Sequence, residues 1–368
     1  MNNTKNSLIL IIIFNFALLI TFSNFSILEP GVQKANINNL FQEEEEMINL
    51  SYNGQLRDFF VESYNASAGD GFQYMKIALG EESFEPYTLR PLYPKLIGKI
   101  ALYLASIIDK EHTKATALNI LQPIMGFFNS IFLVIGVFFL YLTLKKYLDD
   151  ELLSWLLALG LIVGIGTIRT SQFFMLDVLS YSIGAVALYF FTQSKYFYLS
   201  ITIAIGILIK EVLIIYSLLL LYPLHYNKKS ITLVILTLMI PISLFIGLRL
   251  FMSVDILSMQ YGWNVSQGEI DLKYFMVHLG NLSYAILFFT QILFTFGLLW
   301  IFTLYSLKSQ DKKLLLFLFG VIVSIVFANA FLASNVMRVI FIVYPIIALL
   351  SAIGIAQLIN ENFLVVKR

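Results

Sequence analysis

The stretch YFYLSITIAIGILIKEVLIIYSLLLLYPL, residues 196–224, decides the fold of this chain because it admits two topologies. As a single membrane span it would place Lys210 and Glu211 at the middle of the bilayer, where each charge costs about 2.5–3.5 kcal/mol. As two segments of about 13 residues, each segment is only ~20 Å long, against a hydrocarbon core of ~30 Å. Both topologies carry a cost, so charges elsewhere in the chain have to decide between them.

The rest of the chain has the composition of a membrane protein. Hydrophobic residues make up 59% of its 368 residues and charged residues only 13%, whereas about a quarter of a soluble domain is charged. Apolar runs of about 20 residues predict an all-α polytopic membrane protein. The net charge of +1 argues against a nucleic-acid binder, and the lack of cysteine excludes disulfides, thiol nucleophiles and cysteine-ligated metals. Besides residues 196–224, helices are expected near 7–26, 117–143, 152–168, 173–192, 230–252, 276–306, 312–331 and 338–357.

The basic residues of the loops favour the topology with two short segments. If residues 196–224 form a pair with Lys210 and Glu211 facing outward, and the N-terminus is cytoplasmic, every basic cluster falls on the cytoplasmic side. With a single span, the last three clusters would move outside. We therefore expect about ten membrane segments in one transmembrane domain, residues 1–368, of a plasma (inner) membrane, with both termini cytoplasmic and an extracytoplasmic loop at 27–116. The clusters are Lys145-Lys146, Lys195, Lys228-Lys229, Lys308 with Lys312-Lys313, and Lys367-Arg368.

The outward side then carries charges that the positive-inside rule does not explain. In the first loop, GDGFQYMKIALG (69–80) predicts a short amphipathic helix with Asp70 at its N-cap, so Asp70 is either a helix cap or a functional carboxylate. LRPLYPKLIGKIALYLASII (89–108) predicts a second, interfacial helix. The candidate site residues on this side are Asp70, Arg90, Arg169, Asp177, Lys210, Glu211 and Arg338.

These residue types suit the chemistry of a lipid-linked phosphate. Arginine and lysine neutralise the charge that develops on a phosphate leaving group. A carboxylate within hydrogen-bond reach of an acceptor hydroxyl acts as a general base. An ion or solute transporter would also place charges along its pathway, so the charges alone leave both functions open.

The chain resembles the GT-C superfamily of integral membrane glycosyltransferases, in particular the members that depend on dolichyl-phosphate-mannose. The blocks that carry the resemblance come in the family's order: GDGFQYMKIALG with RPLYPKL (90–96), TIRTSQFFMLDVLSYSIGAVALYFF (167–191), YLSITIAIGILIKEVLI (198–214) and SNVMRVIFIVYPII (334–347). The resemblance implies an inverting transfer on the extracytoplasmic face, with Asp70 as the catalytic base. By the same resemblance, substrate-binding roles are expected for Arg90, Arg169, Asp177, Lys210, Glu211 and Arg338.

The resemblance also implies the partners of the chain and leaves alternatives open. The donor would be a polyprenyl-phosphate sugar, the acceptor a glycan, lipid or protein, and the surroundings membrane lipids. Many members carry two adjacent acids in the first loop or a large soluble C-terminal domain, and this chain shows neither. No cofactor and no metal ligand are predicted, and a divalent metal ion stays open as an alternative. Competing functions are a flippase or transporter for lipid-linked glycans and a polysaccharide polymerase or ligase.

Overall fold

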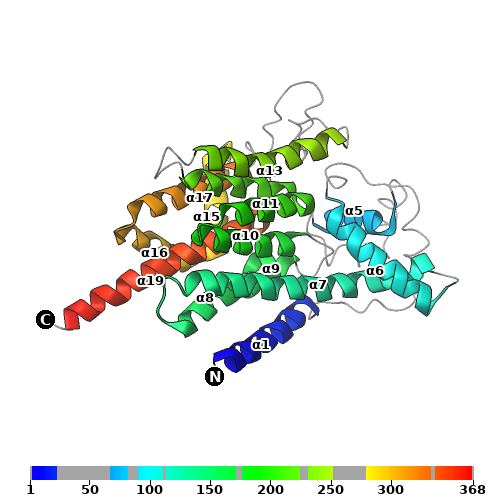
Figure 1. The fold of residues 1–368 in the computed structure, drawn as a ribbon, viewed down its shortest axis with the longest axis horizontal. Coiled ribbons are helices and arrows are strands. Elements are labelled where there is room, and N and C mark those ends of the chain that lie inside the picture. The colour runs from blue at the N-terminus through cyan, green and yellow to red at the C-terminus, as the bar shows by residue number, and fades with distance from the viewer. Residues whose placement is uncertain are drawn as a thin grey trace.

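A computed structural model describes residues 2–22, 67–81, 90–110, 113–170, 176–223, 231–251, 279–332 and 336–366. All regular elements in these ranges are helical, and they form an elongated bundle (Figure 1). The α-helices are α1 (Asn2–Phe22), α5 (Ser67–Leu79), α6 (Leu92–Ile108), α7 (Thr113–Leu144), α8 (Glu151–Val163), α9 (Ile165–Thr170), α10 (Asp177–Thr192), α11 (Tyr196–Ile209), α13 (Ile231–Phe251), α15 (Leu282–Phe296), α16 (Leu299–Tyr305), α17 (Lys312–Leu332), α18 (Val336–Ile340) and α19 (Tyr344–Val366). Three 3₁₀-helices join them: η2 (Glu211–Leu221), η4 (Ser306–Lys308) and η5 (Phe341–Val343).

Several of these helices are long and apolar enough to cross a bilayer. Four pass by length and composition among the described residues, and a fifth span is added if the bent pair α15–α16 is counted as one. Shorter apolar helices include α10, α11 and η2. The chain therefore has the all-α fold of a membrane protein. The four are Pro123–Leu144, Glu151–Ile168, Ile231–Phe251 and Met337–Asn360.

The expectation of one continuous helix over 276–306 is wrong for the part of it that the structure describes. Helices α15 and α16 meet at an angle of 88°. The bend lies at Gly297, whose φ of 51° is in the left-handed region that glycine adopts most readily. The indole Nε1 of Trp300 donates a hydrogen bond to the carbonyl oxygen of Ile292 across the bend, at 3.3 Å.

The division of residues 196–224 into two segments is confirmed. Helix α11 ends at Ile209, Lys210 is extended, and η2 begins at Glu211. The two segments run in opposite directions, because the start of α11 and the end of η2 both contact the end of α10. The ring centroids are 5.5 Å apart for Phe190 and Tyr198, and 5.3 Å apart for Phe191 and Tyr222.

The Lys-Glu pair has the right order for the tip of this hairpin. A cation is favourable at the C-terminus of a helix and an acid at the N-terminus, and here Lys210 follows α11 while Glu211 opens η2. A 3₁₀-helix rises more per residue than an α-helix, so the shorter segment η2 reaches nearly the same length as α11. The 11 residues of η2 rise about 22 Å, and the 14 residues of α11 rise about 21 Å.

The described lysines of the predicted cytoplasmic loops gather at one end of the bundle. The ammonium of Lys146, after α7, donates to the carbonyl oxygen of Thr192, the last residue of α10, at 2.6 Å. Tyr222, just after η2, contacts Phe317 of α17 with ring centroids 4.9 Å apart. We call this the lysine-rich end, and α5 and α6 lie at the opposite end (Figure 1). It carries Lys145, Lys146, Lys195, Lys308, Lys312 and Lys313; the clusters Lys228-Lys229 and Lys367-Arg368 lie outside the described residues.

Helices α5 and α6 are held to the bundle by a small core of their own. Its buried members come from α5, α6, the first half of α7, the start of α10 and the end of α11. The two helices cross so closely at Gly98 that a Cβ atom there would lie 1.8 Å from the carbonyl oxygen of Ala78. This core brings α5 beside the hairpin tip formed by Lys210 and Glu211. Its members include Tyr74, Ile77, Ala78, Tyr93, Ile97, Leu121, Leu176, Leu179 and Ile209.

The close crossing gives a first testable expectation. Gly98→Ala should push α5 away from α6 and lower the free energy of unfolding by about 1–3 kcal/mol, as overpacking does in other cores. The matched control is Gly247→Ala in α13, where a Cβ atom would meet nothing within 4 Å. Thermal unfolding in detergent should show a lower midpoint for the first variant only. Equal midpoints for both variants would contradict the described crossing.

Candidate functional site

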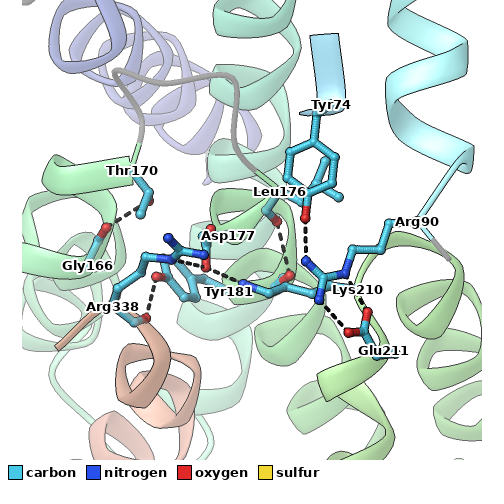
Figure 2. Close-up of polar contacts among 11 residues, drawn as sticks. Tyr74, Arg90, Gly166, Thr170, Leu176, Asp177, Tyr181, Lys210, Glu211 and Arg338 are labelled. Atoms are coloured by element: carbon cyan, nitrogen blue, oxygen red, sulfur yellow. Dashed lines mark hydrogen bonds and ion pairs between the residues drawn. The ribbon is translucent and has the colours of Figure 1, made fainter. Parts of the chain in front are cut away.

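Five buried charged side chains meet near α5 (Figure 2), which lies at the end of the bundle opposite the lysine-rich end (Figure 1). They come from four separate parts of the chain: the residue pair before α6, the start of α10, the hairpin tip and α18. Such groups are rarely buried unless they are paired. We call them the charge cluster: Arg90, Asp177, Lys210, Glu211 and Arg338, with exposed fractions of 0%, 2%, 4%, 7% and 7%.

One half of the cluster is a carboxylate shared by two cations. Asp177 is the first residue of α10, where its charge also favours the helix N-terminus. Its Oδ1 accepts a hydrogen bond from the ammonium of Lys210 at 2.5 Å and another from Nε of Arg338 at 3.3 Å. Asp177 therefore joins α10 to the hairpin tip and to α18.

The other half is a bidentate arginine–carboxylate pair. Nε of Arg90 donates to Oε2 of Glu211 at 2.5 Å, and Nη2 donates to Oε1. Nη1 donates to the hydroxyl of Tyr74 on α5. Burial alone would lower the pKa of Arg90, but the Glu211 carboxylate beside it raises this pKa above its ordinary value, so Arg90 stays charged. This half ties the segment before α6 to the hairpin tip.

Tyrosine hydroxyls fix the backbone that carries Arg338. Tyr181 of α10 donates to the carbonyl oxygen of Arg338 at 2.7 Å, and Tyr216 of η2 donates to that of Ile342 at 2.6 Å. These carbonyls lie where α18 gives way to η5, so side chains satisfy backbone groups that the change of helix type leaves free. The position of Arg338 is thereby set by the same two elements that carry Asp177 and Glu211.

The cluster has the electrostatic character of a site for an anion. Three cations and two carboxylates leave these five side chains with a net charge of +1. Electrostatic interactions are stronger in a buried site than in water, so a phosphate brought here would interact strongly with the guanidinium and ammonium groups. The two carboxylates hold the cations in position, and an incoming anion could exchange with them.

The structure therefore brings together five of the seven predicted site residues. Asp70 is the fourth residue of α5, which begins at Ser67, so its expected place at the N-cap is wrong. Arg169 lies in α9, which packs against α18. The side chains of Asp70 and Arg169 lie outside the described part of the chain.

The sequence did not single out Tyr74, which binds Arg90 from α5. In an amphipathic helix a tyrosine is usually part of the apolar face, and Tyr74 is indeed buried in the small core around α5 and α6. The available signal was spacing, because residues four apart lie on one face of a helix and Tyr74 follows Asp70 by four. The backbone of Asp70 is thus one turn away from a residue that contacts the charge cluster.

Replacing Tyr74 with phenylalanine tests this contact. Tyr74→Phe keeps the ring but removes the oxygen that accepts from Arg90, and a lost hydrogen bond to a charged group costs about 1.5–3 kcal/mol. Tyr93→Phe is the matched control in the same small core, because the Tyr93 hydroxyl donates only to a neutral amide, Oδ1 of Asn129, at 2.9 Å. Thermal unfolding should show the larger loss for Tyr74→Phe. A loss no larger than that of the control would mean that the Arg90 contact adds nothing.

The described residues contain no group of three or more His, Asp or Glu side chains that could hold a metal ion. The two carboxylates of the charge cluster are occupied by cations from the protein itself. Since the side chain of Asp70 is not among those described, the divalent-metal alternative stays open.

Fold and site together define a class: an all-α membrane protein with a buried, net-cationic cluster at one end of its helix bundle. Comparisons with protein families, with curated proteins and with solved structures give no match to this chain. A function therefore has to be proposed from the residues themselves.

Proposed function

We propose that this protein is an inverting membrane glycosyltransferase of the GT-C type, which moves a sugar from a polyprenyl-phosphate donor to an acceptor on the extracytoplasmic face. The proposal includes about ten membrane segments, with both termini cytoplasmic, and a role in cell-surface glycan or glycolipid assembly. The observation that carries it is the convergence of Arg90, Lys210 and Arg338 in one buried cluster, far apart in sequence and adjacent in space.

The position of the cluster supports this proposal. A lipid phosphate sits at headgroup depth, so an enzyme that uses it needs cations at one end of its membrane helices. The charge cluster contacts Tyr74 of α5, and α5 lies at the end opposite the lysine-rich end (Figure 1). Lysines accumulate on the cytoplasmic side of membrane proteins. With the lysine-rich end in the cytoplasm, the cluster faces the extracytoplasmic side.

In the proposed reaction Asp70 accepts the proton of the acceptor hydroxyl. The acceptor oxygen forms a bond to the anomeric carbon of the donor sugar while the bond from that carbon to the phosphate oxygen breaks. The electron pair of the broken bond goes to the phosphate, whose charge Lys210 and Arg338 stabilise, with Arg90 and Arg169 as further cations. A single displacement of this kind inverts the anomeric configuration. Asp177 and Glu211 orient the cations, and apolar surfaces between helices hold the prenyl chain.

The distribution of buried charge favours an enzyme over a flippase. Ionisable side chains inside a membrane protein mark the path of an ion or of a charged substrate across the bilayer. In the described part of the chain, six charged side chains are buried: Arg249 and the five of the charge cluster. Arg249 is in the last turn of α13, and the other five meet in one place, so the buried charges do not follow the length of the bundle.

Reconstituted vesicles separate the candidate functions. The purified protein is supplied with a radiolabelled polyprenyl-phosphate sugar and a panel of glycan, lipid and peptide acceptors, and in a separate assay with polyprenyl-diphosphate-linked oligosaccharides. The proposal expects a new glycosidic bond and one polyprenyl phosphate released per sugar transferred. Movement of the donor across the bilayer without a new bond would instead establish a flippase. A long product formed from diphosphate-linked oligosaccharides would establish a polymerase or ligase.

A further inference from the structure

We propose that the exposed face of α6 lies in the lipid headgroup region and binds anionic lipids through Lys95 and Lys99. The inference rests on how the side chains of α6 divide between the protein and its surroundings. It does not depend on the reaction proposed above.

One strip of α6 is used to attach the helix to the rest of the protein. Tyr93, Ile97, Ala101 and Ala105 follow one another at intervals of four residues and are all buried, with exposed fractions of 2% or less. They belong to the small core shared with α5 and α7. This strip fixes the rotation of α6 about its own axis, and it therefore determines which side chains of the helix face away from the protein.

A second strip is apolar and exposed. Leu96, Tyr103 and Ile107 lie on one side of the helix and are 47%, 67% and 66% exposed. Such a row of large apolar side chains is unfavourable in water and typical of a surface that meets lipid or another protein. The helix is about 25 Å long and carries Lys95 and Lys99 in its first half, where charges would be costly inside the hydrocarbon core, so a position along the membrane surface suits α6 better than a crossing.

A third strip, next to the apolar one, carries Lys95 and Lys99. The two lysines are one turn apart and both are exposed. Within the described residues neither makes an ion pair, whereas nearby Lys114 pairs with Glu81 at 2.7 Å. An apolar strip flanked by unpaired lysines matches a leaflet surface, where acyl chains lie beside negatively charged headgroups. Charge complementarity therefore identifies the occupant as anionic lipid.

The lack of cysteine makes the position of α6 directly measurable, because single cysteine variants can be spin-labelled without background. Labels are placed at residues 96, 99 and 107 of the full chain in nanodiscs, with residue 236 of α13 as a membrane reference. We expect oxygen to relax the labels at 96 and 107 more than a water-soluble nickel complex does, and the label at 99 to lie at headgroup depth. A water-exposed signal at 96 and 107 would overturn the proposal. So would strong dipolar coupling between two copies, which would make the face a protein–protein interface.

Lipid selectivity tests the lysines themselves. The full chain is reconstituted with spin-labelled phosphatidylglycerol or phosphatidylcholine, and the immobilised fraction of each lipid is compared. Lys95→Gln and Lys99→Gln should each lower the preference for phosphatidylglycerol, by up to about fivefold per lysine. Lys114→Gln is the matched control and should leave the preference unchanged, because Lys114 is already paired with Glu81. An unchanged preference in the Lys95→Gln/Lys99→Gln double variant would refute anionic-lipid binding at this face.

Discussion

Replacing Asp177 with asparagine is expected to lower the free energy of unfolding by about 3–5 kcal/mol, the range seen when one partner of a buried ion pair is removed. Asp177 is 2% exposed and is the carboxylate that faces both Lys210 and Arg338. Asparagine keeps the size of the side chain but removes the negative charge. The lower free energy of unfolding would therefore be caused by the missing charge and not by a cavity.

A second substitution should restore part of the stability that Asp177→Asn loses. The double variant Asp177→Asn/Lys210→Met removes one charge of each sign, and replacing both partners of a buried pair can be nearly neutral. Thermal or chemical unfolding in detergent should show the double variant to be more stable than Asp177→Asn alone. Glu151→Gln is the surface control, because the exposed pair of Glu151 and Lys145 at 3.9 Å should change stability by less than about 1 kcal/mol. Wild-type stability of Asp177→Asn would show that the cluster is not held by this carboxylate.

The sequence predicts the helices of this fold better than their breaks. The hairpin at Lys210 could be predicted because two adjacent charges in an apolar run are costly at mid-bilayer, and the basic loops then select one topology. The bend at Gly297 could not be predicted, because hydropathy stays high on both sides of it and a glycine in a membrane helix is common. Its left-handed φ is a property of the folded chain.

The charge cluster could be predicted because the chain is so poor in charge. With only 13% charged residues, a cation on the outward side of the predicted topology is unusual, and this criterion selects Arg90, Lys210 and Arg338 from the sequence. What the sequence could not give was the pairing. The described partners of Asp177 are Lys210 and Arg338, because the fold brings the hairpin tip and α18 to the start of α10.

The pairing has a consequence for how the proposed enzyme would bind its donor. Lys210 and Arg338 already bind the carboxylate of Asp177, so a phosphate has to bind these two cations at least as strongly as this carboxylate does. The donor is a phosphodiester with one negative charge, as on a carboxylate, but the phosphate monoester that leaves carries about −1.5 to −2 and has three terminal oxygens that can bind arginine in a bidentate manner, so the cations stabilise the charge that develops during the reaction. The buried carboxylates would then keep the cations in place between turnovers without blocking the donor.

Asp70→Asn is expected to abolish sugar transfer while leaving the protein folded. General-base catalysis contributes about 10²–10⁴-fold, and the amide of asparagine cannot accept the proton of an acceptor hydroxyl at neutral pH. Since the proton moves only in the chemical step, kcat should fall while the KM for the donor changes little. The backbone of Asp70 lies in the first turn of α5, one turn before Tyr74, which contacts the charge cluster. A base at this point of the chain is therefore close to the cations that are proposed to hold the phosphate.

The measurement is the initial rate of transfer from purified polyprenyl-phosphate sugar, with thermal unfolding of the same samples as the test of folding. Asp70→Glu restores a carboxylate and should recover part of the rate, which a purely structural helix-terminal role does not require. Glu81→Gln is the control for removing an acid elsewhere in the first loop, because Glu81 makes an exposed pair with Lys114, and its rate should stay near that of the wild type. Near-normal turnover by Asp70→Asn would remove Asp70 from the mechanism. The charge cluster would then have to act with a different base, and the first loop offers Glu82 and Glu85, outside the described residues, as the next carboxylates to replace.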